Sequence, residues 1–142
     1  IMKILILCTG NSCRSQMAHG WLSSLLKNNH HVKIYSAGIE AHGINPYMKT
    51  VMLEKGIDVS NHTSNTISEY KDLYFDYVIT VCNNAKGNCP YFQNSKIKIH
   101  KSFTDPANAK GSDEEKLIIY RKVRDEIKIF CDDLFQNEFK IN

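Results

Sequence analysis

The alternation of short β-rich runs with helical patterns is the feature that most constrains the fold of this chain. The β-rich runs lie at residues 3–8, 32–37, 77–82 and 97–101, with helical patterns between the first three and after the last. Strands that alternate with helices form βαβ units and pair in parallel. The pattern therefore predicts an α/β fold: a small doubly wound parallel sheet of four strands, in the order 2-1-3-4, flanked by helices.

Capping residues mark where the helices begin and end. Asn45-Pro46 is typical of an N-cap followed by a first helical residue, and Gly56 of a left-handed stop. A hydroxyl residue followed three positions later by glutamate forms a capping box, and this pattern occurs at Thr66 with Glu69 and at Ser112 with Glu115. One apolar helical face is predicted after the first strand, at Ala18, Trp21, Leu22, Leu25 and Leu26.

Size and charge exclude several functional classes. A chain of 142 residues is typical of one domain, so we expect residues 1–142 to fold as one. The net charge of +3 is mild, and no run of Lys and Arg or mixture of basic and aromatic residues indicates nucleic-acid binding. The apolar run at 4–8 is too short for a membrane span or a signal peptide. We expect a monomer with no nucleic-acid or membrane partner.

The cysteines and histidines do not form a metal-binding pattern. Five cysteines are an odd number without the spacing of a disulfide scaffold, which favours reduced thiols in a cytoplasmic protein. No Cys-x2-Cys or His-x3-His pair occurs, and the six histidines are scattered, which predicts surface or loop positions. We therefore expect neither a metal nor another cofactor.

Residues 8–15 predict an oxyanion cradle. They read Cys-Thr-Gly-Asn-Ser-Cys-Arg-Ser, between a predicted strand and a predicted helix. Backbone N–H groups of such a loop point at one centre, the helix dipole adds positive potential, and Arg14 adds a bidentate fork. The same groups favour a thiolate, so Cys8 is predicted to ionise readily and act as the nucleophile. The anion would be bound by Thr9, Gly10, Asn11, Ser12, Cys13, Arg14 and Ser15.

Finer expectations concern individual loop residues. Gly10 and Asn11 suit left-handed turns, and the Ser15 hydroxyl is placed to donate to the Cys8 sulfur. Cys13 is close enough to Cys8 for an off-pathway disulfide, although a structural role in the core is favoured. A phosphate-binding loop without chemistry is the alternative interpretation of the whole motif.

Cys82 and Cys89 form a second cysteine pair. In the predicted strand order Cys8 and Cys82 end neighbouring strands, about 5 Å apart at one rim. On an ideal helix Cys82 and Cys89 would be about 10 Å apart, beyond the ~4.4–6.8 Å between Cα atoms that a disulfide allows. The segment between them, with Gly87 and three asparagines, is a poor helix former. It is predicted to switch between a loosely helical reduced form and a looped oxidised form; two ordinary half-buried thiols are the alternative.

Asp105 is the candidate general acid. It follows the fourth predicted strand, and Pro106 restricts it to an extended conformation that fixes the direction of its carboxyl group. Loops after parallel strands meet at one rim, so Asp105 can reach an oxygen that leaves the bound oxyanion and protonate it. A simple turn that begins with Asp-Pro is the alternative.

These residues resemble the thioredoxin-coupled arsenate reductases, which share the fold of the low-molecular-weight tyrosine phosphatases. The resemblance runs nearly end to end. It covers Cys-Thr-Gly-Asn-Ser-Cys-Arg-Ser-Gln-Met-Ala at 8–18, Tyr-Ser-Ala-Gly-Ile-Glu at 35–40, Gly-Ile-Asp-Val-Ser-Asn-His-Thr-Ser at 56–64, the Cys82/Cys89 pair, Asp-Pro-Ala at 105–107 and Arg-Lys-Val-Arg-Asp-Glu-Ile at 121–127.

The resemblance implies a three-thiol relay for arsenic detoxification. Cys8 would attack arsenate held by the loop and Arg14, while Asp105 protonates the departing oxygen. Cys82 would then attack Cys8 and release arsenite, and Cys89 would resolve that bridge into a Cys82–Cys89 disulfide for thioredoxin to reduce. Phosphate and sulfate would act as mimics of arsenate, so the redox thiols, and not the cradle, distinguish the substrate.

The sequence departs from some relatives at a potassium site beside the loop. Two carboxylate positions of that site match His19 and Asn65 here, while Asn11, Ser36 and Thr63 are retained. The loss of two anionic oxygens weakens cation binding. We therefore expect a weak or absent potassium effect.

Two other functions remain as alternatives. A low-molecular-weight tyrosine phosphatase would use the same loop and acid, but it usually has Pro where this chain has Gln16 and Tyr where it has Ala107. Residual hydrolysis of small aryl phosphates is nevertheless expected, because the cradle is complete. A redox or oxyanion sensor would show a disulfide switch without sustained turnover.

Overall fold

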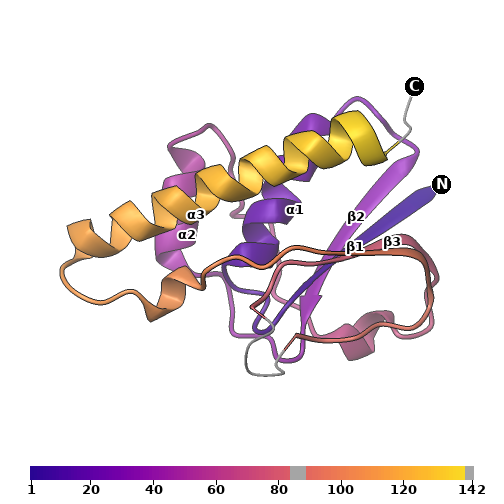
Figure 1. Ribbon diagram of the computed structural model, residues 1–142, viewed down its shortest axis with the longest axis horizontal. Coiled ribbons are helices and arrows are strands. Elements are labelled where there is room, and N and C mark those ends of the chain that lie inside the picture. The colour runs from indigo at the N-terminus through magenta and orange to yellow at the C-terminus, as the bar shows by residue number, and fades with distance from the viewer. Residues whose placement is uncertain (84–88, 140–142) are drawn as a thin grey trace.

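A computed structural model describes residues 1–83 and 89–139 of the chain (Figure 1). Four strands and three α-helices alternate as the sequence predicts. In chain order they are β1 (Met2–Cys8), α1 (Arg14–Leu25), β2 (Val32–Gly38), α2 (Pro46–Leu53), β3 (Phe75–Thr80), β4 (Ser95–His100) and α3 (Asp113–Asp133). Two short 3-10 helices and a π-helical turn complete the described elements, at Ile67–Tyr70, Pro106–Asn108 and Leu134–Glu138.

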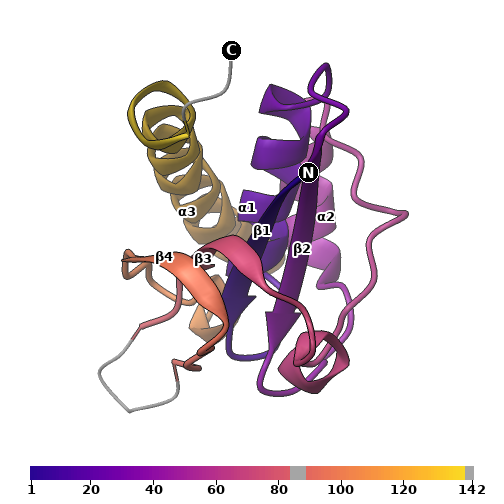
Figure 2. The ribbon, with the colours of Figure 1, turned by 90° about the vertical axis from the view of Figure 1, so that its right-hand side faces the viewer.

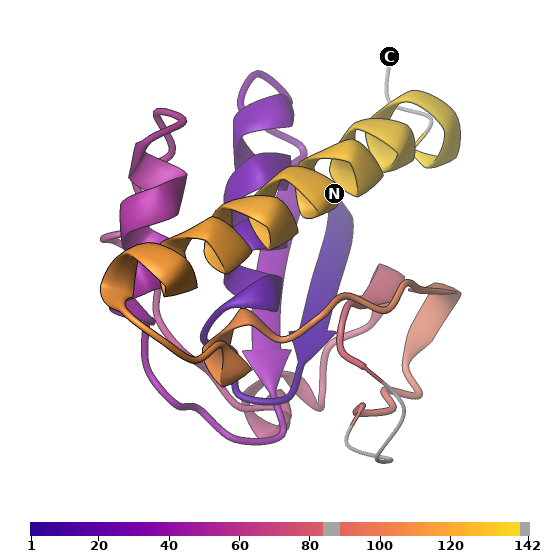
Figure 3. The ribbon, with the colours of Figure 1, turned by 60° about the vertical axis from the view of Figure 1, so that its left-hand side comes forward.

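The strands form one parallel sheet in the order β2-β1-β3-β4, which confirms the predicted topology. Side chains alternate along β1, so Ile4 and Ile6 belong to the larger core and Leu5 and Leu7 to the smaller one. α1, α2 and α3 pack together over the larger core (Figure 3). The opposite face is covered by the segment around the 3-10 helix Ile67–Tyr70 (Figure 2).

Most of the predicted helix boundaries are confirmed. Asn45 caps α2 by accepting a hydrogen bond from the backbone N–H of Met48 at 3.1 Å, and Gly56 takes the left-handed conformation with φ of 77°. Ser112 opens α3 with a capping box. The capping box at Thr66 is also present, but it opens the short 3-10 helix Ile67–Tyr70 and not an α-helix.

The end of β3 differs from the prediction. The strand ends at Thr80, the last residue that pairs with both β1 and β4, so Cys82 lies two residues beyond the strand. One more backbone bond, from Val81 N to Leu7 O at 3.0 Å, continues the direction of the strand. β1 and β3 are neighbours, as predicted. The residues that follow β3, Cys82 among them, therefore begin at the same edge of the sheet as Cys8, the last residue of β1.

Residues 84–88, for which a reduced helical form and an oxidised looped form are predicted, lie outside the described residues. In the part of the chain that is described, no helix combines the length and the apolar character that crossing a membrane requires.

Candidate active site

The loop between β1 and α1 surrounds a small pocket at the carboxyl edge of the sheet. The pocket has a volume of about 110 Å³, which is the volume of only a few water molecules. The short helix Pro106–Asn108 lies near the ends of the strands where the arrowheads point (Figure 3), and Asp105, which precedes it, lies 3.4 Å from Arg14 of the loop. The pocket is lined by Cys8, Thr9, Gly10, Ser12, Cys13, Arg14, His42, Asp105 and Ala107.

Asn11 holds the loop in shape from behind the pocket. It is fully buried and adopts the left-handed conformation with φ of 46°, as predicted. Its Nδ2 donates to Ser15 Oγ at 2.9 Å, and its Oδ1 accepts from the backbone N–H of Asn65 at 2.8 Å. These bonds offset the cost of the left-handed backbone and tie the loop to the segment after α2.

Gly10 is needed for a different reason from the predicted one. Asn11 is the non-glycine residue with positive φ, and Gly10 is not among the described glycines with positive φ. The ring of His42 packs directly on Gly10, so an added Cβ would collide with it. Close approach of the His42 side chain, and not a left-handed turn, therefore favours glycine at this position, and a larger residue would displace the His42 ring.

Arg14 is a buried guanidinium whose fork is only partly used. Nη1 donates to the backbone oxygen of Phe103 at 3.1 Å, and Nη2 lies 3.4 Å from Asp105 Oδ2. Within the described part of the chain, Arg14 Nε is buried and has no hydrogen-bond partner. A buried unpaired donor is costly, so a guanidinium that keeps one and also lines the pocket fits an oxyanion ligand.

Asp105 uses its two carboxylate oxygens differently. Oδ1 accepts from the backbone N–H of Ala107 at 3.0 Å and so caps the 3-10 helix Pro106–Asn108. Oδ2 faces Arg14, and the backbone of Asp105 is extended, as expected before proline. The capping role and the general-acid role are therefore compatible, because each needs one oxygen.

The environment of Cys8 contradicts the expectation that its thiol ionises readily. Burial is the largest effect and raises the pKa of the Cys8 thiol, and the carboxylate of Asp105 raises it further. The Arg14 guanidinium and the backbone N–H groups of Thr9 and Ser15 lower the pKa. The cradle does favour the thiolate, but burial outweighs it. The predicted contact of the sulfur with Ser15 comes from the backbone N–H.

Substituting Asp105 by Asn should make Cys8 more reactive toward alkylating agents. The substitution removes a negative charge that raises the pKa of the Cys8 thiol, so the thiolate fraction at a given pH increases. The measurement is the pH dependence of Cys8 alkylation by iodoacetamide, with Cys13→Ser in both proteins. The midpoint should move to lower pH in the variant. An unchanged or higher midpoint would contradict this electrostatic assignment.

Cys13 lines the pocket but is held as a neutral thiol. It is buried, and burial raises its pKa to about 12, with a smaller contribution from Asp105. Tyr120 on α3 hydrogen-bonds its sulfur. These contacts fit the structural role of Cys13. Because Cys13 also lines the pocket that contains Cys8, a disulfide between the two remains compatible with the structure. Cys131 is buried on α3, where burial also raises its pKa.

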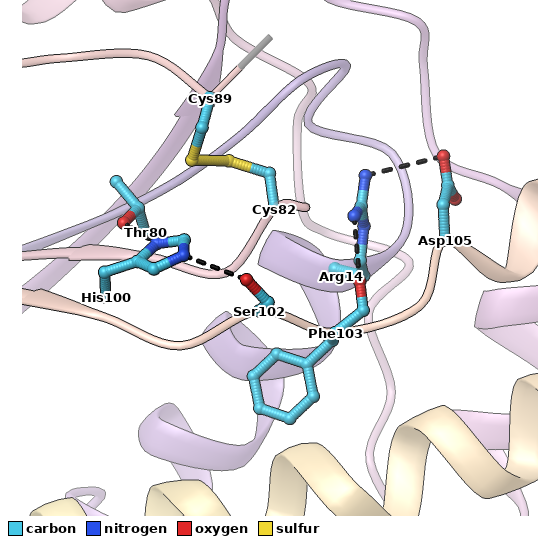
Figure 4. The surroundings of a disulfide bond; sticks show 8 residues. All are labelled: Arg14, Thr80, Cys82, Cys89, His100, Ser102, Phe103 and Asp105. Atoms are coloured by element: carbon cyan, nitrogen blue, oxygen red, sulfur yellow. Dashed lines mark hydrogen bonds and ion pairs between the residues drawn. A yellow bond between two sulfur atoms is a disulfide. The ribbon is translucent and has the colours of Figure 1, made fainter. Parts of the chain in front are cut away.

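Cys82 and Cys89 are joined by a disulfide, with their Cα atoms 5.6 Å apart (Figure 4). Cys8, Cys13 and Cys131 are free. Cys82 is fully buried and belongs to the larger core, whereas Cys89 is half-buried. Of the two bonded cysteines, Cys89 is therefore the more accessible residue.

His42 and Glu40 are site residues that the sequence analysis missed. His42 lines the pocket, and its Nε2 lies 2.6 Å from Glu40 Oε2. Both residues follow β2, in a loop that the backbone bond from His42 N to Gly10 O, at 2.9 Å, ties to the cradle. The stretch 35–40 was part of the resemblance, but no motif pointed to a histidine beside the nucleophile.

His19 departs from the expected surface or loop position because it lies on α1, whereas His62 lies in a loop as expected. The His19 ring packs against the His62 ring, with 4.4 Å between ring centroids and 33° between ring planes, and His19 Nδ1 lies 2.8 Å from Ser36 Oγ. Burial, with a smaller effect of His62, lowers the pKa of His19 to about 3, so its ring is neutral. His62 Nδ1 lies 2.9 Å from Gln16 Oε1, and Gln16 Nε2 donates to the backbone oxygen of Asn11.

The residues at the potassium-site positions form hydrogen bonds with one another and with their neighbours, and Asn65 Nδ2 also donates to Glu69 Oε1 at 3.0 Å. Thr63 Oγ1 donates to Asn65 Oδ1 at 2.7 Å, the Asn11 oxygen accepts from the Asn65 backbone, and Ser36 is paired with His19. No carboxylate occupies either of the two departing positions, and oxygen-rich, anionic sets are what hard cations require. Among the described residues, no group of three or more His, Cys, Asp and Glu side chains is arranged so that it could hold a metal ion.

Activity should therefore respond equally to potassium and sodium salts. The measurement is kcat/KM for arsenate in KCl and in NaCl at equal ionic strength. Equal values are expected because the candidate ligand oxygens are already hydrogen-bonded. A clear activation by potassium over sodium would contradict the prediction.

Comparison with protein families identifies the class of the chain. The family of low molecular weight phosphotyrosine protein phosphatases matches residues 3–141. The chain therefore belongs to this family, as its sheet order and Cys-x5-Arg-Ser loop indicate.

Within this family, its similar curated relatives are arsenate reductases. The arsenate reductase of Halalkalibacterium halodurans is 51% identical over 124 residues, which cover 87% of this chain and 88% of the relative. That of Bacillus subtilis is 48% identical over the same shares of the two chains.

Solved structures agree with both levels of the classification. A structure described as an arsenate reductase in the oxidised state is 27% identical, covers 95% of this chain and 97% of its own, and has a TM-score of 0.79. Another, in the phosphate-binding state, is 29% identical over the same shares with a TM-score of 0.75. The YwlE arginine phosphatase from Geobacillus stearothermophilus is 26% identical, covers 96% and 92%, and has a TM-score of 0.70.

Proposed function

We propose that this chain reduces arsenate to arsenite through Cys8, Cys82 and Cys89, with thioredoxin as the reductant, and so serves arsenic detoxification. The observation that carries the proposal is the Cys82–Cys89 disulfide beside a pocket that holds a free Cys8 with Arg14. A phosphatase needs the pocket but has no use for a redox pair. The relatives named arsenate reductase support the same activity.

In the first step Cys8 attacks arsenate. The anion is held by the N–H groups of the loop and by Arg14, whose buried Nε is an available donor. The As–S bond forms while an As–O bond breaks, and Asp105 supplies the proton with which that oxygen leaves as water. The negative charge of Asp105 raises the Cys8 pKa, so a protonated Asp105 also favours the attacking thiolate.

In the second step the two electrons come from thiols. The Cys82 thiolate attacks the Cys8 sulfur, the As–S electron pair passes to arsenic, and arsenite leaves with Cys8–Cys82 bonded. Cys89 then attacks Cys82, which frees Cys8 and leaves the Cys82–Cys89 disulfide. The described protein, with that disulfide and a free Cys8, matches the state that this step would leave. No metal or organic cofactor is needed, because the thiols supply both electrons.

In the last step thioredoxin, a dithiol protein, reduces Cys82–Cys89. Its thiolate would attack Cys89, since Cys82 is fully buried and Cys89 is not. This reaction suits a monomer in the cytoplasm, where thiol reductants keep free cysteines reduced.

Replacing Cys89 by Ser should stop the relay after about one turnover. Without Cys89 the Cys8–Cys82 bond cannot be resolved, so it should accumulate. Intact mass and peptide mapping after one addition of arsenate would detect that bond, with Cys131→Ser as the matched thiol control. Undiminished multiple turnover of the Cys89 variant with thioredoxin would refute the role of Cys89.

Hydrolysis of phosphate monoesters is the second candidate function. The pocket contains the nucleophile, Arg14 and Asp105 that such a reaction needs, and the family supports it. Ala107 lines the pocket where phosphatases usually have tyrosine, so no aromatic wall of that kind flanks an aryl group there. Slow hydrolysis of small aryl phosphates is therefore expected beside the arsenate reaction.

A further inference from the structure

One carbonyl group of the cradle is held in place by two side chains. Gln16 Nε2 donates to the backbone oxygen of Asn11 at 3.2 Å, and Ser64 Oγ donates to the same oxygen at 2.9 Å. None of these three residues lines the pocket, so both bonds are made outside it. The two preceding carbonyl oxygens, of Thr9 and Gly10, accept from backbone N–H groups in the loop after β2. The Asn11 oxygen therefore depends most on side chains, which substitution can remove.

Gln16 is itself fixed by three hydrogen bonds. It is fully buried on α1, its Nε2 also donates to the backbone oxygen of Thr63 at 3.0 Å, and its Oε1 lies 2.9 Å from His62 Nδ1. Two carbonyl oxygens can accept only from the NH₂ group of an amide, so this end of Gln16 faces Asn11 and Thr63. The side chain therefore holds the Asn11 oxygen in one direction.

The hydroxyl group of Ser64 is oriented toward the cradle in a similar way. Ser64 Oγ accepts from the backbone N–H of Gly43 at 3.1 Å and donates to the cradle, at 2.9 Å from the Asn11 oxygen and 3.3 Å from the Gly10 oxygen. A hydroxyl group has one hydrogen, so the shorter bond, to Asn11, is the main one. Ser64 follows α2 and Gln16 belongs to α1, so two distant segments meet at one oxygen.

The position of the Asn11 oxygen fixes the direction of the Ser12 N–H group. Both groups belong to one peptide unit, which is planar and trans, so they point to opposite sides of the chain. Ser12 lines the pocket, and among the described residues no group accepts from its N–H. Together with Arg14 Nε it is thus an unpaired donor at this pocket. Donors that are oriented before the anion binds stabilise charge without the cost of reorganisation.

We propose that Gln16 and Ser64 are positioning residues for oxyanion binding. They hold the Asn11 oxygen outside the pocket and so keep the Ser12 N–H directed at the bound anion. Neither side chain contacts the anion itself. Without them the peptide unit between Asn11 and Ser12 is free to turn, and the cradle loses one oriented donor. The proposal rests on the proposed function, which makes a tetrahedral oxyanion the ligand of this pocket.

The test is a titration of the full-length, 15N-labelled chain with inorganic phosphate, followed by the amide signal of Ser12. In the native chain the amide proton should move downfield, because it gains a charge-assisted hydrogen bond. In Ser64→Ala and in Gln16→Met this shift at saturation should shrink, and the phosphate dissociation constant should rise by about tenfold. Ser64→Thr keeps the hydroxyl group and should restore both values. Ser60→Ala, at an exposed serine of the same segment, is the matched control.

Three results would overturn the proposal. The first is a Ser12 signal that does not respond to phosphate in the native chain. The second is a native shift and native affinity in both variants, and the third is weaker binding with the native Ser12 shift, which would indicate a general structural role. If Gln16→Met does not fold, the Ser64 variants decide, since Ser64 is only half-buried. The titration needs neither arsenate nor thioredoxin, so a failure of arsenate reduction would be seen separately.

Discussion

Replacing Cys82 by Ser is expected to abolish sustained arsenate reduction and to leave hydrolysis of aryl phosphates intact. The serine cannot attack the arsenic-bound Cys8 sulfur to form a disulfide, so no electrons reach arsenic. Hydrolysis uses only the pocket around Cys8, Arg14 and Asp105, and Cys82 is not among the residues that line it. Both activities should be measured on the same preparation of the variant.

The hydrolysis rate also serves as the control for folding. Cys82 is buried in the larger core, so a serine hydroxyl placed there costs stability, about 1–3 kcal/mol if it stays unpaired. Thermal unfolding of the variant measures that cost. Arsenate reduction that continues in a folded Cys82→Ser protein would remove Cys82 from the mechanism.

Replacing Asp105 by Ala should slow arsenate chemistry by roughly 10²–10⁴-fold, the range for loss of a general acid. Arg14 and the loop N–H groups remain, so anion binding should be largely preserved. The measurement is kcat together with the inhibition constant of phosphate, with the exposed Asp72→Ala as the control. A near-normal kcat would exclude Asp105 as the acid, and a large loss of phosphate affinity would indicate that Asp105 mainly positions Arg14.

The parts of the fold that follow local rules could be predicted from the sequence. The sheet order follows from alternation of strands and helices, the start of α2 from Asn45-Pro46, and its stop from Gly56. The pocket also follows, because strand, loop and helix are contiguous and need no distant partner. Asp105 could be placed because loops after parallel strands share one rim.

The properties that depend on distant contacts could not be predicted. The ring of His42 reaches Gly10 from the loop after β2, and His19 is covered by His62 from a segment far along the chain. Cys8 is less acidic than its loop suggests, since its burial depends on how the whole sheet edge packs. In each case the local motif is present as predicted. A residue that is distant in sequence but close in space changes the environment of the motif, and the spacing of residues in the sequence does not reveal that contact.

The most direct test of the thiol relay is arsenate-dependent oxidation of NADPH by the native chain in the presence of thioredoxin and thioredoxin reductase. The relay predicts many turnovers per enzyme, which stop when thioredoxin is omitted. The absence of arsenate-dependent oxidation, in a preparation that still hydrolyses an aryl phosphate, would contradict it and make the chain a phosphatase with an unused pair of cysteines.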